Sequence, residues 1–305
     1  MVNVVNELLK QMVAYTPIYT LSSLGLVIGG RAGIFNVSGE GTMLAAASAG
    51  YIVALQTGNW LLGILASAAM GAAFGFTLVF IHETTKVSQF IIGISLVILG
   101  AGLSDLLYKL VLGVQLFIPE APKVPEVRIP LLSRIPFLSA FINQNVIVYL
   151  TYALVILVYY FLYKTKPGLE LRAVGENPKA ADVVGINVTL TRYLTTTLGG
   201  ALLGIAGGYL PLVVTGTYTP NITNGRGFIA VGIAIFASWR PERTFLGALL
   251  FAAIEAIALQ MQLSGTVIPY QFFLMTPFIG ILVVMWLFKK KVEFPASLGK
   301  PYSRE

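Results

Sequence analysis

Long apolar stretches dominate this sequence and leave few folds open to it. A helix that spans the hydrocarbon core of a bilayer needs about 20 mostly apolar residues. Seven windows meet that requirement, at residues 12–28, 59–81, 90–112, 146–163, 192–214, 244–261 and 270–288. Two shorter windows, 36–55 and 227–239, are apolar but are interrupted by glycine and polar residues. The sequence therefore predicts an all-α polytopic membrane protein with about nine crossings, within a range of eight to ten, some of them short broken helices.

The charged residues agree with this class. They make up 11% of the 305 residues, whereas a soluble domain carries about a quarter. We predict one transmembrane domain over residues 1–305, surrounded by membrane lipid. The net charge of +7 comes from Lys and Arg in short segments between apolar runs, so we predict no nucleic-acid partner.

Several chemistries are excluded by residue counts. The chain has no cysteine and a single histidine, His82, which rules out a disulfide framework, a thiolate site and a multi-histidine metal centre. We predict no metal and no cofactor. The N-terminus lacks a basic n-region and a small-residue cleavage pattern, so we predict no removable signal peptide.

Orientation follows from the basic segments, because short cytoplasmic loops hold the excess of Lys and Arg. These segments are residues 164–192, 240–243 and 289–291. Even numbers of predicted crossings separate them, so all three can share one side. We therefore predict a multi-pass protein of the cell membrane with a cytoplasmic loop at 164–191, a cytoplasmic C-terminus and an external N-terminus.

A loop rich in proline is predicted at residues 113–140. Residues 117–137 contain five prolines, which cannot continue a helix. The segment should lie outside the cell. It is either a connecting loop on the membrane face or a docking surface for an external partner.

An internal repeat is also predicted. Each half has a whole helix, then a Gly-Arg pair, at Gly30-Arg31 and Gly225-Arg226, then a short interrupted segment and a helix rich in alanine and glycine. In the predicted topology the two copies run in opposite senses, which is the inverted arrangement known in transporters.

One short polar helix stands out in "GENPKAADVVGIN" at residues 175–187. Asn177 is a favoured N-cap, Pro178 suits the first helical position, and Gly185 supplies a left-handed stop. The helix carries a predicted small-residue face and two polar positions: Ala180, Ala181, Val183 and Val184, with Lys179 and Asp182. Two turns are marginally stable alone, so the helix should rest on its own bundle or on a cytoplasmic partner.

Here the chain resembles a family. Lys179-Ala180-Ala181 with Gly185 resembles the Glu-Ala-Ala-x-x-x-Gly loop of ABC importer permeases, and residues 168–188 resemble that loop in permeases for ribose, branched-chain amino acids and nucleosides. Residues 30–51 and 225–256 are similar to the signatures of the nucleoside and simple-sugar group. Lys179 stands where the family usually has Glu, which puts any salt bridge at that position in doubt.

The resemblance implies a function and partners. Asn177 to Gly185 would be the coupling helix, which fits a groove on separate ABC ATPase subunits. A second permease subunit, identical or different, and an external substrate-binding lipoprotein would complete the importer. Its cargo would be a nucleoside or a simple sugar.

No catalytic residues are predicted. The sequence lacks G-x-x-x-x-G-K-[ST], so ATP should bind to another polypeptide, and His82 is the single histidine that a catalytic triad could use. We therefore predict that this chain is not an enzyme. Two alternative functions remain. One is an ion-coupled secondary transporter, which could also use the repeat and the membrane carboxylates. The other is a membrane-embedded enzyme, which the lack of a nucleophile and base constellation disfavours.

Polar residues inside the predicted crossings are candidates for a substrate pathway. An ionisable side chain there costs about 2.5–3.5 kcal/mol, so it usually faces a cavity or a partner. Glu40, Asp105 and Glu255 are of this kind, and the alternative for Glu40 and Glu255 is a structural hydrogen bond or ion pair. The other candidates are Asn36, Ser38, Gln89 and Asn224, for the hydroxyls of a sugar or nucleoside, and Phe35 and Phe228, for an apolar ring face. Glycines such as Gly200 and Gly204 are explained by helix packing.

Overall fold

A computed structural model describes residues 2–113, 118–127, 141–263, 270–288 and 292–303. The helices are α1 (Val2–Arg31), α2 (Gly39–Thr57), α3 (Trp60–Thr85), α4 (Gln89–Leu112), α6 (Val146–Lys164), α7 (Lys166–Glu176), α8 (Pro178–Val183), α9 (Val188–Tyr209), α10 (Arg226–Phe236), α11 (Pro241–Leu263) and α12 (Tyr270–Phe288). A π-helical turn, η1 (Leu210–Val214), continues α9. Two short strands, β1 (Glu126–Val127) and β2 (Gln144–Asn145), pair antiparallel. Apart from this pair the regular structure of the described chain is helical, which confirms the predicted class.

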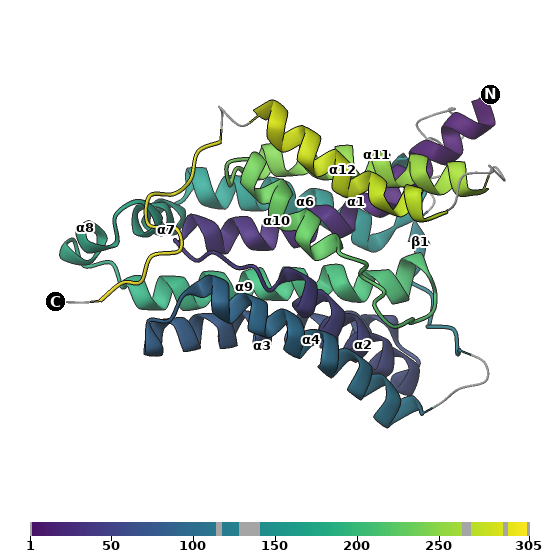
Figure 1. The fold of residues 1–305 in the computed structure, drawn as a ribbon, viewed down its shortest axis with the longest axis horizontal. Helices are drawn as coiled ribbons and strands as arrows, with labels where there is room; N and C mark the ends of the chain where they lie inside the picture. Colours follow the sequence, from purple (N-terminus) through teal and green to yellow (C-terminus); the bar gives the residue numbers. More distant parts are fainter. Residues whose placement is uncertain (1, 114–117, 128–140, 264–269, 289–291, 304–305) are drawn as a thin grey trace.

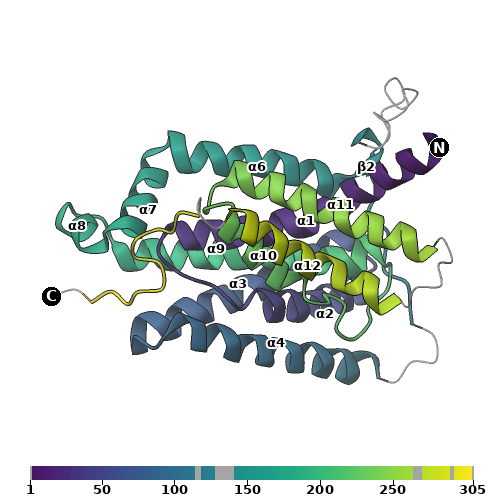
Figure 2. The same cartoon turned by 45° about the horizontal axis from the view of Figure 1, so that its top comes forward.

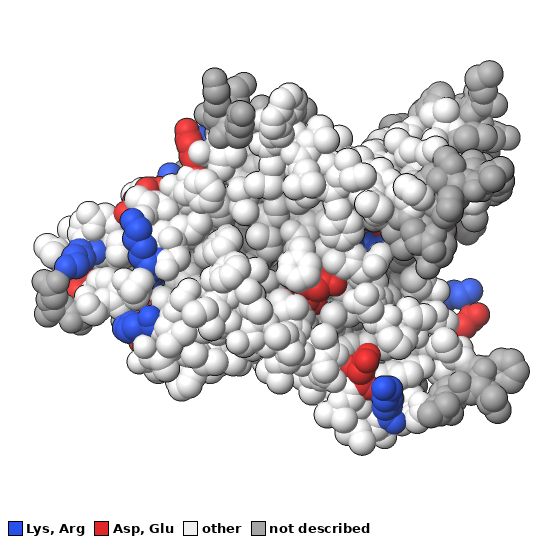
Figure 3. Space-filling view, viewed as in Figure 1, with Lys and Arg blue, Asp and Glu red and all other residues white. Residues whose placement is uncertain are grey.

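The long helices run roughly along one axis of an elongated molecule (Figures 1 and 2). Helices α7 and α8 and the C-terminus lie at one end, which we call the α8 end, and the N-terminus lies at the other. On the face drawn in Figure 3, most charged side chains lie toward the two ends, and few lie between them. Large apolar side chains point outward along the long helices, for example Ile98 on α4 and Ile156 on α6, both 70% exposed. This surface suits a hydrocarbon environment.

The number of crossings is not confirmed. Among the described residues, six helices are long and apolar enough to span a membrane: α1, α3, α4, α6, α9 with η1, and α11. Helix α10 and the Met275–Trp286 part of α12 are apolar but shorter. Helix α2 has 19 residues, but glycine, serine, threonine and Glu40 lower its hydropathy. Nine crossings therefore stay a prediction.

Glycine sets the close packing of α9 against its neighbours. A Cβ atom at Gly200 would overlap the carbonyl oxygen of Gly71 on α3, and one at Gly204 would overlap that of Ser67. On another side of α9, a Cβ at Gly199 would overlap the carbonyl oxygen of Gly25 on α1. The predicted role of these glycines in helix packing is confirmed.

The two segments that follow the Gly-Arg pairs meet inside the molecule. Helices α2 and α10 begin next to each other. Their backbones are so close that a Cβ atom at Gly227 would overlap the backbone nitrogen of Glu40. A Cβ at Gly39 would lie 3.2 Å from the Gly227 carbonyl oxygen. This contact agrees with an inverted repeat, which stays a prediction.

Part of the proline-rich loop at 113–140 lies outside the described residues. Within 118–127, Tyr51 donates a hydrogen bond to the Pro119 carbonyl, and the Ala121 amide donates to the Gly216 carbonyl at 2.7 Å. The segment is thus held against α2 and the turn after η1. Its role as a docking surface stays a prediction.

Candidate functional site

The short helix α8 projects from one end of the molecule (Figure 1). The Asn177 side chain accepts a hydrogen bond from the Ala180 amide at 3.1 Å, and Pro178 occupies the first turn. Gly185 has a φ of +89°, which favours glycine, and its amide donates to the Asp182 carbonyl at 2.9 Å. The predicted helix and both its ends are confirmed.

The predicted small-residue face does not form as one face. Ala181 is 3% exposed, whereas Val183 is 87% and Val184 76% exposed. Residues 181 and 183 lie about 200° apart around a helix with 3.6 residues per turn, so Ala181 turns inward and Val183 turns outward. Lys179 and Ala180 are also exposed. The end of α8 therefore exposes two apolar side chains, Val183 and Val184, to its surroundings.

Helix α7 carries α8 and is locked onto α1. Gly175 approaches the end of α1 so closely that a Cβ atom would overlap the Arg31 carbonyl oxygen. The Arg31 guanidinium in turn donates to the carbonyls of Trp239, at 2.7 Å, and Ser238, at 3.1 Å. The base of α8 is thus connected to α1 and to the turn between α10 and α11.

A buried ion pair lies at the same end. Arg192 Nη1 lies 2.9 Å from Glu83 Oε1, and their side chains are 0% and 3% exposed. Lys86 Nζ lies 2.8 Å from Glu83 Oε2. Our sequence reading missed this pair. Its signal was available, because an arginine at the edge of one apolar window and a glutamate at the edge of another fall on the same side in the predicted topology.

Glu40 holds the start of α10. Its carboxylate accepts hydrogen bonds from Thr223 Oγ1 at 2.5 Å, from the Gly225 amide at 2.7 Å and from the Gly227 amide at 2.8 Å. Glu40 is 4% exposed. A carboxylate is favourable there because the first amides of a helix have no partner within the helix. These contacts are the structural hydrogen bonds that the sequence analysis gave as the alternative to a pathway role for Glu40.

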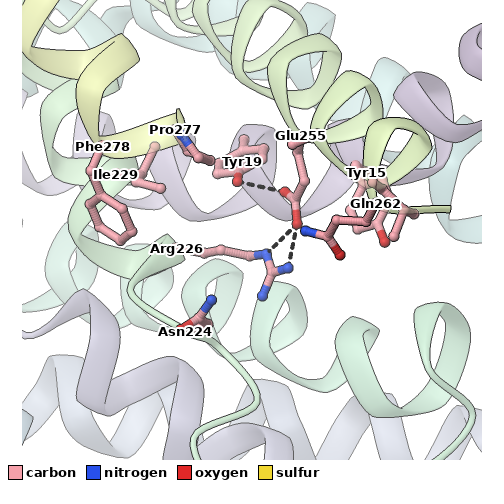
Figure 4. A pocket seen from close by; sticks show the side chains of 11 residues that line it. Tyr15, Tyr19, Asn224, Arg226, Ile229, Glu255, Gln262, Pro277 and Phe278 are labelled. Carbon is pink, nitrogen blue, oxygen red and sulfur yellow. Dashed lines mark hydrogen bonds and ion pairs between the residues drawn. The ribbon is translucent and has the colours of Figure 1, made fainter. Parts of the chain in front are cut away.

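A second polar cluster surrounds Glu255 (Figure 4). Arg226 Nε donates to Glu255 Oε1 at 3.0 Å, Arg226 Nη2 contacts the same oxygen, and the Tyr19 hydroxyl donates to Oε2 at 2.6 Å. Glu255 on α11 therefore connects α10 with α1. This is the structural ion pair that the sequence analysis gave as the alternative to a pathway role for Glu255.

The cluster borders a small cavity. Its volume is about 140 Å³, and polar side chains of Tyr15, Asn224 and Gln262 line it together with Phe278 (Figure 4). Sites for drug-sized molecules have volumes of about 300–1,000 Å³. The cavity has aromatic and hydrogen-bonding walls suited to a polar ring, but in this conformation it is smaller than such sites.

The remaining candidates for a substrate pathway make local contacts. Asn36 Oδ1 accepts hydrogen bonds from the Ser38 amide, at 2.9 Å, and from Ser38 Oγ, at 2.6 Å, so the two residues form a local turn before α2. Gln89 lies between the Phe35 amide and the His82 ring. Phe228 is 44% exposed. Among the candidates, Asn224 and Glu255 line the same cavity.

The sequence reading missed Arg226, Tyr15 and Tyr19 as members of this cluster. A carboxylate inside a crossing needs a counter-charge, and Arg226 begins a short apolar segment. That requirement pointed to Arg226. The two tyrosines, four residues apart on α1, gave no comparable signal, because aromatic residues in a crossing usually pack in the core.

Comparisons with known proteins bear on the whole chain. A family profile described as "branched-chain amino acid transport system / permease component" matches residues 8–285. The putative glucose ABC transporter permease protein TsgC13 of Haloferax volcanii is 36% identical, over 84% of this chain and 78% of that protein. The nucleoside ABC transporter permease protein NupC of Lactococcus lactis is 32% identical over 98% of both chains. The guanosine ABC transporter permease protein NupQ of Bacillus subtilis is 29% identical over 99% of this chain and 98% of that protein.

Proposed function

Because this chain belongs to the permease family of branched-chain amino acid transport systems, we propose that it is the membrane subunit of an ABC importer, driven through α8 by separate ATPase subunits. The observation that carries the proposal is the form of α8. It is capped at both ends, connected through Gly175 to α1, and has Val183 and Val184 exposed. A rigid helix of this kind can receive a push from a partner and pass it to the membrane helices.

The proposed cargo is a nucleoside or a simple sugar. The relatives named for nucleoside and guanosine transport match nearly the full length of the chain, and a glucose permease shares the highest of the three identities. Within the membrane, Asn224 and Glu255 have the best support as pathway residues, because they line a cavity. The lining of that cavity does not include the other candidates, which are Phe35, Asn36, Ser38, Glu40, Gln89 and Phe228.

The proposed orientation places the α8 end in the cytoplasm. The basic segments at 164–192 and 240–243 lie at that end, as does the C-terminal segment, which supports a cytoplasmic C-terminus and an external N-terminus. A second permease subunit, identical or different, would complete the pathway in the cell membrane, and an external lipoprotein would deliver the cargo.

Transport measurements test this proposal. Vesicles that contain this chain with its candidate ATPase and receptor should take up labelled guanosine or glucose only when ATP is supplied. Ala181→Glu and Gly185→Pro should reduce uptake at least about tenfold, because a carboxylate cannot enter the buried site of Ala181 without a partner and proline cannot adopt the φ of Gly185. Gly102→Ala, in open space on α4, is the control.

The rival function has a distinct result. The partly buried Arg226–Glu255 pair would also suit an ion-coupled secondary transporter. Uptake that continues without the ATPase and stops when the ion gradient is removed would establish that carrier and overturn the importer.

A further inference from the structure

The C-terminal segment, residues 292–303, runs across the α8 end and is hydrogen-bonded to the backbone there. The Ser297 amide donates to the Gly175 carbonyl at 2.9 Å, and the Gly299 amide donates to the Gly33 carbonyl at 3.0 Å. Ser297 is 4% exposed. A Cβ atom at Gly33, whose φ is +90°, would lie 2.6 Å from Ser297 Oγ, so the groove has room for the segment because this residue is glycine. The segment is part of the folded unit and does not lie loosely on its surface.

The start of this segment is anchored at the turn between α10 and α11. The Phe294 ring packs on Trp239 with 4.9 Å between the ring centroids. The Glu293 amide donates to Ser238 Oγ at 3.2 Å. Trp239 and Ser238 are the residues whose carbonyls accept from Arg31 at the end of α1. The segment therefore runs from the membrane helices toward α8.

The end of the segment belongs to the apolar cluster that contains the buried residue of α8. Tyr302 is 7% exposed and packs in one apolar cluster with Val174 of α7, Ala181 of α8 and Val188 of α9. Ala181 is the buried residue of α8. The Arg192 guanidinium lies 5.9 Å from the centre of the Tyr302 ring. The ring of Tyr302 is thus part of the surface on which α8 rests.

A cleft opens beside this contact. It has a volume of about 470 Å³ and is lined by Lys86, Asp182, residues 185–189, Tyr302 and Ser303. Its walls therefore come from the turn after α3, from α8, from the start of α9 and from the C-terminal segment. The exposed Val183 lies on the same helix as Asp182, and the exposed Val184 directly follows that helix.

Helix α8 alone is too small to form a protein interface of ordinary size. A stable protein interface buries about 800 Å² on each partner, from about 20–30 residues. Helix α8 has six residues and is about 9 Å long. A subunit that binds α8 must therefore also contact the elements around it, and the C-terminal segment is one of them.

We propose that residues 292–303 and α8 form one docking surface for the ATPase subunit, and that the Tyr302 ring sets the position of α8 on that surface. This inference rests on the proposed function. The occupant is the ATPase subunit because the cleft is continuous with α8, the element through which that subunit would drive transport. Tyr302 is a positioning residue, which acts through Ala181.

The test uses the assembled transporter, with this chain and its ATPase subunits in lipid vesicles. Two quantities are measured, the affinity of the ATPase subunit for the membrane subunit and the number of ATP molecules hydrolysed per cargo molecule imported. Tyr302→Ala should weaken the affinity and raise the ratio, each at least about threefold, which is the range for residues that couple two sites. A role in folding alone would not raise the ratio.

Two matched variants isolate the ring. Tyr302→Phe keeps the ring and should behave like the unchanged protein. Leu110→Ala removes a large exposed side chain on α4, outside the proposed docking surface, so it should also have no effect. An effect of Leu110→Ala equal to that of Tyr302→Ala would overturn the assignment to Tyr302.

The result that overturns the inference differs from the result that overturns the proposed function. If Ala181→Glu abolishes ATP-driven uptake while Tyr302→Ala leaves affinity and ratio unchanged, the docking surface excludes the C-terminal segment and the importer stands. If Ala181→Glu also leaves ATP-driven uptake unchanged, the role of α8 itself is wrong.

Discussion

Arg226→Met is expected to destabilise the folded protein by about 3–5 kcal/mol, because it leaves the Glu255 carboxylate buried without a counter-charge. The side chains of Arg226 and Glu255 are 17% and 12% exposed, so water does little to solvate the remaining charge. The Tyr19 hydroxyl would still donate to Glu255 but cannot neutralise it. Urea unfolding in a mild detergent, followed by tryptophan fluorescence, measures the change.

The double variant Arg226→Met with Glu255→Leu is the control for this prediction. Replacing both members of a buried pair by apolar residues is often close to neutral, so the double variant should recover most of the lost stability. A double variant as unstable as the single one would contradict the account. The instability would then come from the packing of Arg226 and not from the unpaired carboxylate.

Gly200→Leu is expected to have the second large effect. It should lower the free energy of unfolding by more than about 3 kcal/mol, because overpacking strains a close contact. Most of the folded protein should then be lost. A Cβ atom at Gly200 would overlap the Gly71 carbonyl oxygen and would lie 2.9 Å from the Cα of Gly75. Helix α3 would have to move away from α9. The yield of monodisperse protein after size-exclusion chromatography measures the result.

Gly102→Leu is the matched control for the packing prediction. It makes the same change on α4, where nothing lies within 4 Å of the added Cβ atom. Its yield should equal that of the unchanged chain. If Gly200→Leu gives a normal yield, or if both variants fail alike, the close approach of α3 and α9 does not determine the fold.

Much of the fold was predictable from local pattern. The window 59–81 became α3 (Trp60–Thr85), and 146–163 became α6 (Val146–Lys164), because long apolar runs end at polar residues that cap helices. The start of α1 was not predictable from hydropathy, since residues 2–11 are polar as well as apolar. The π-helical turn η1 was also missed. It contains Pro211, which cannot donate the backbone hydrogen bond that a regular α-helix would need there.

In the candidate site, too, local features could be predicted from the sequence and contacts between distant residues could not. The ends of α8 could be predicted because Asn177, Pro178 and Gly185 act on their own backbone. The partners of Ala181 could not, because Tyr302 is more than a hundred residues away along the chain. Pairs such as Arg226 with Glu255 are also separated in sequence. The sequence shows that a charge inside a crossing needs a partner, but only the folded structure identifies that partner.

The central claim, that α8 is the contact with the ATPase subunit, is tested most directly by site-specific cross-linking. The chain has no cysteine, so Val183→Cys places a single thiol, at an α8 position that is 87% exposed, for a photoreactive maleimide. Leu110→Cys, on α4 at a position that is 73% exposed, is the control. In vesicles that transport cargo, the account predicts a cross-link to the ATPase subunit from residue 183 and none from residue 110. No cross-link from residue 183 in an active transporter, or equal cross-links from both positions, would contradict it.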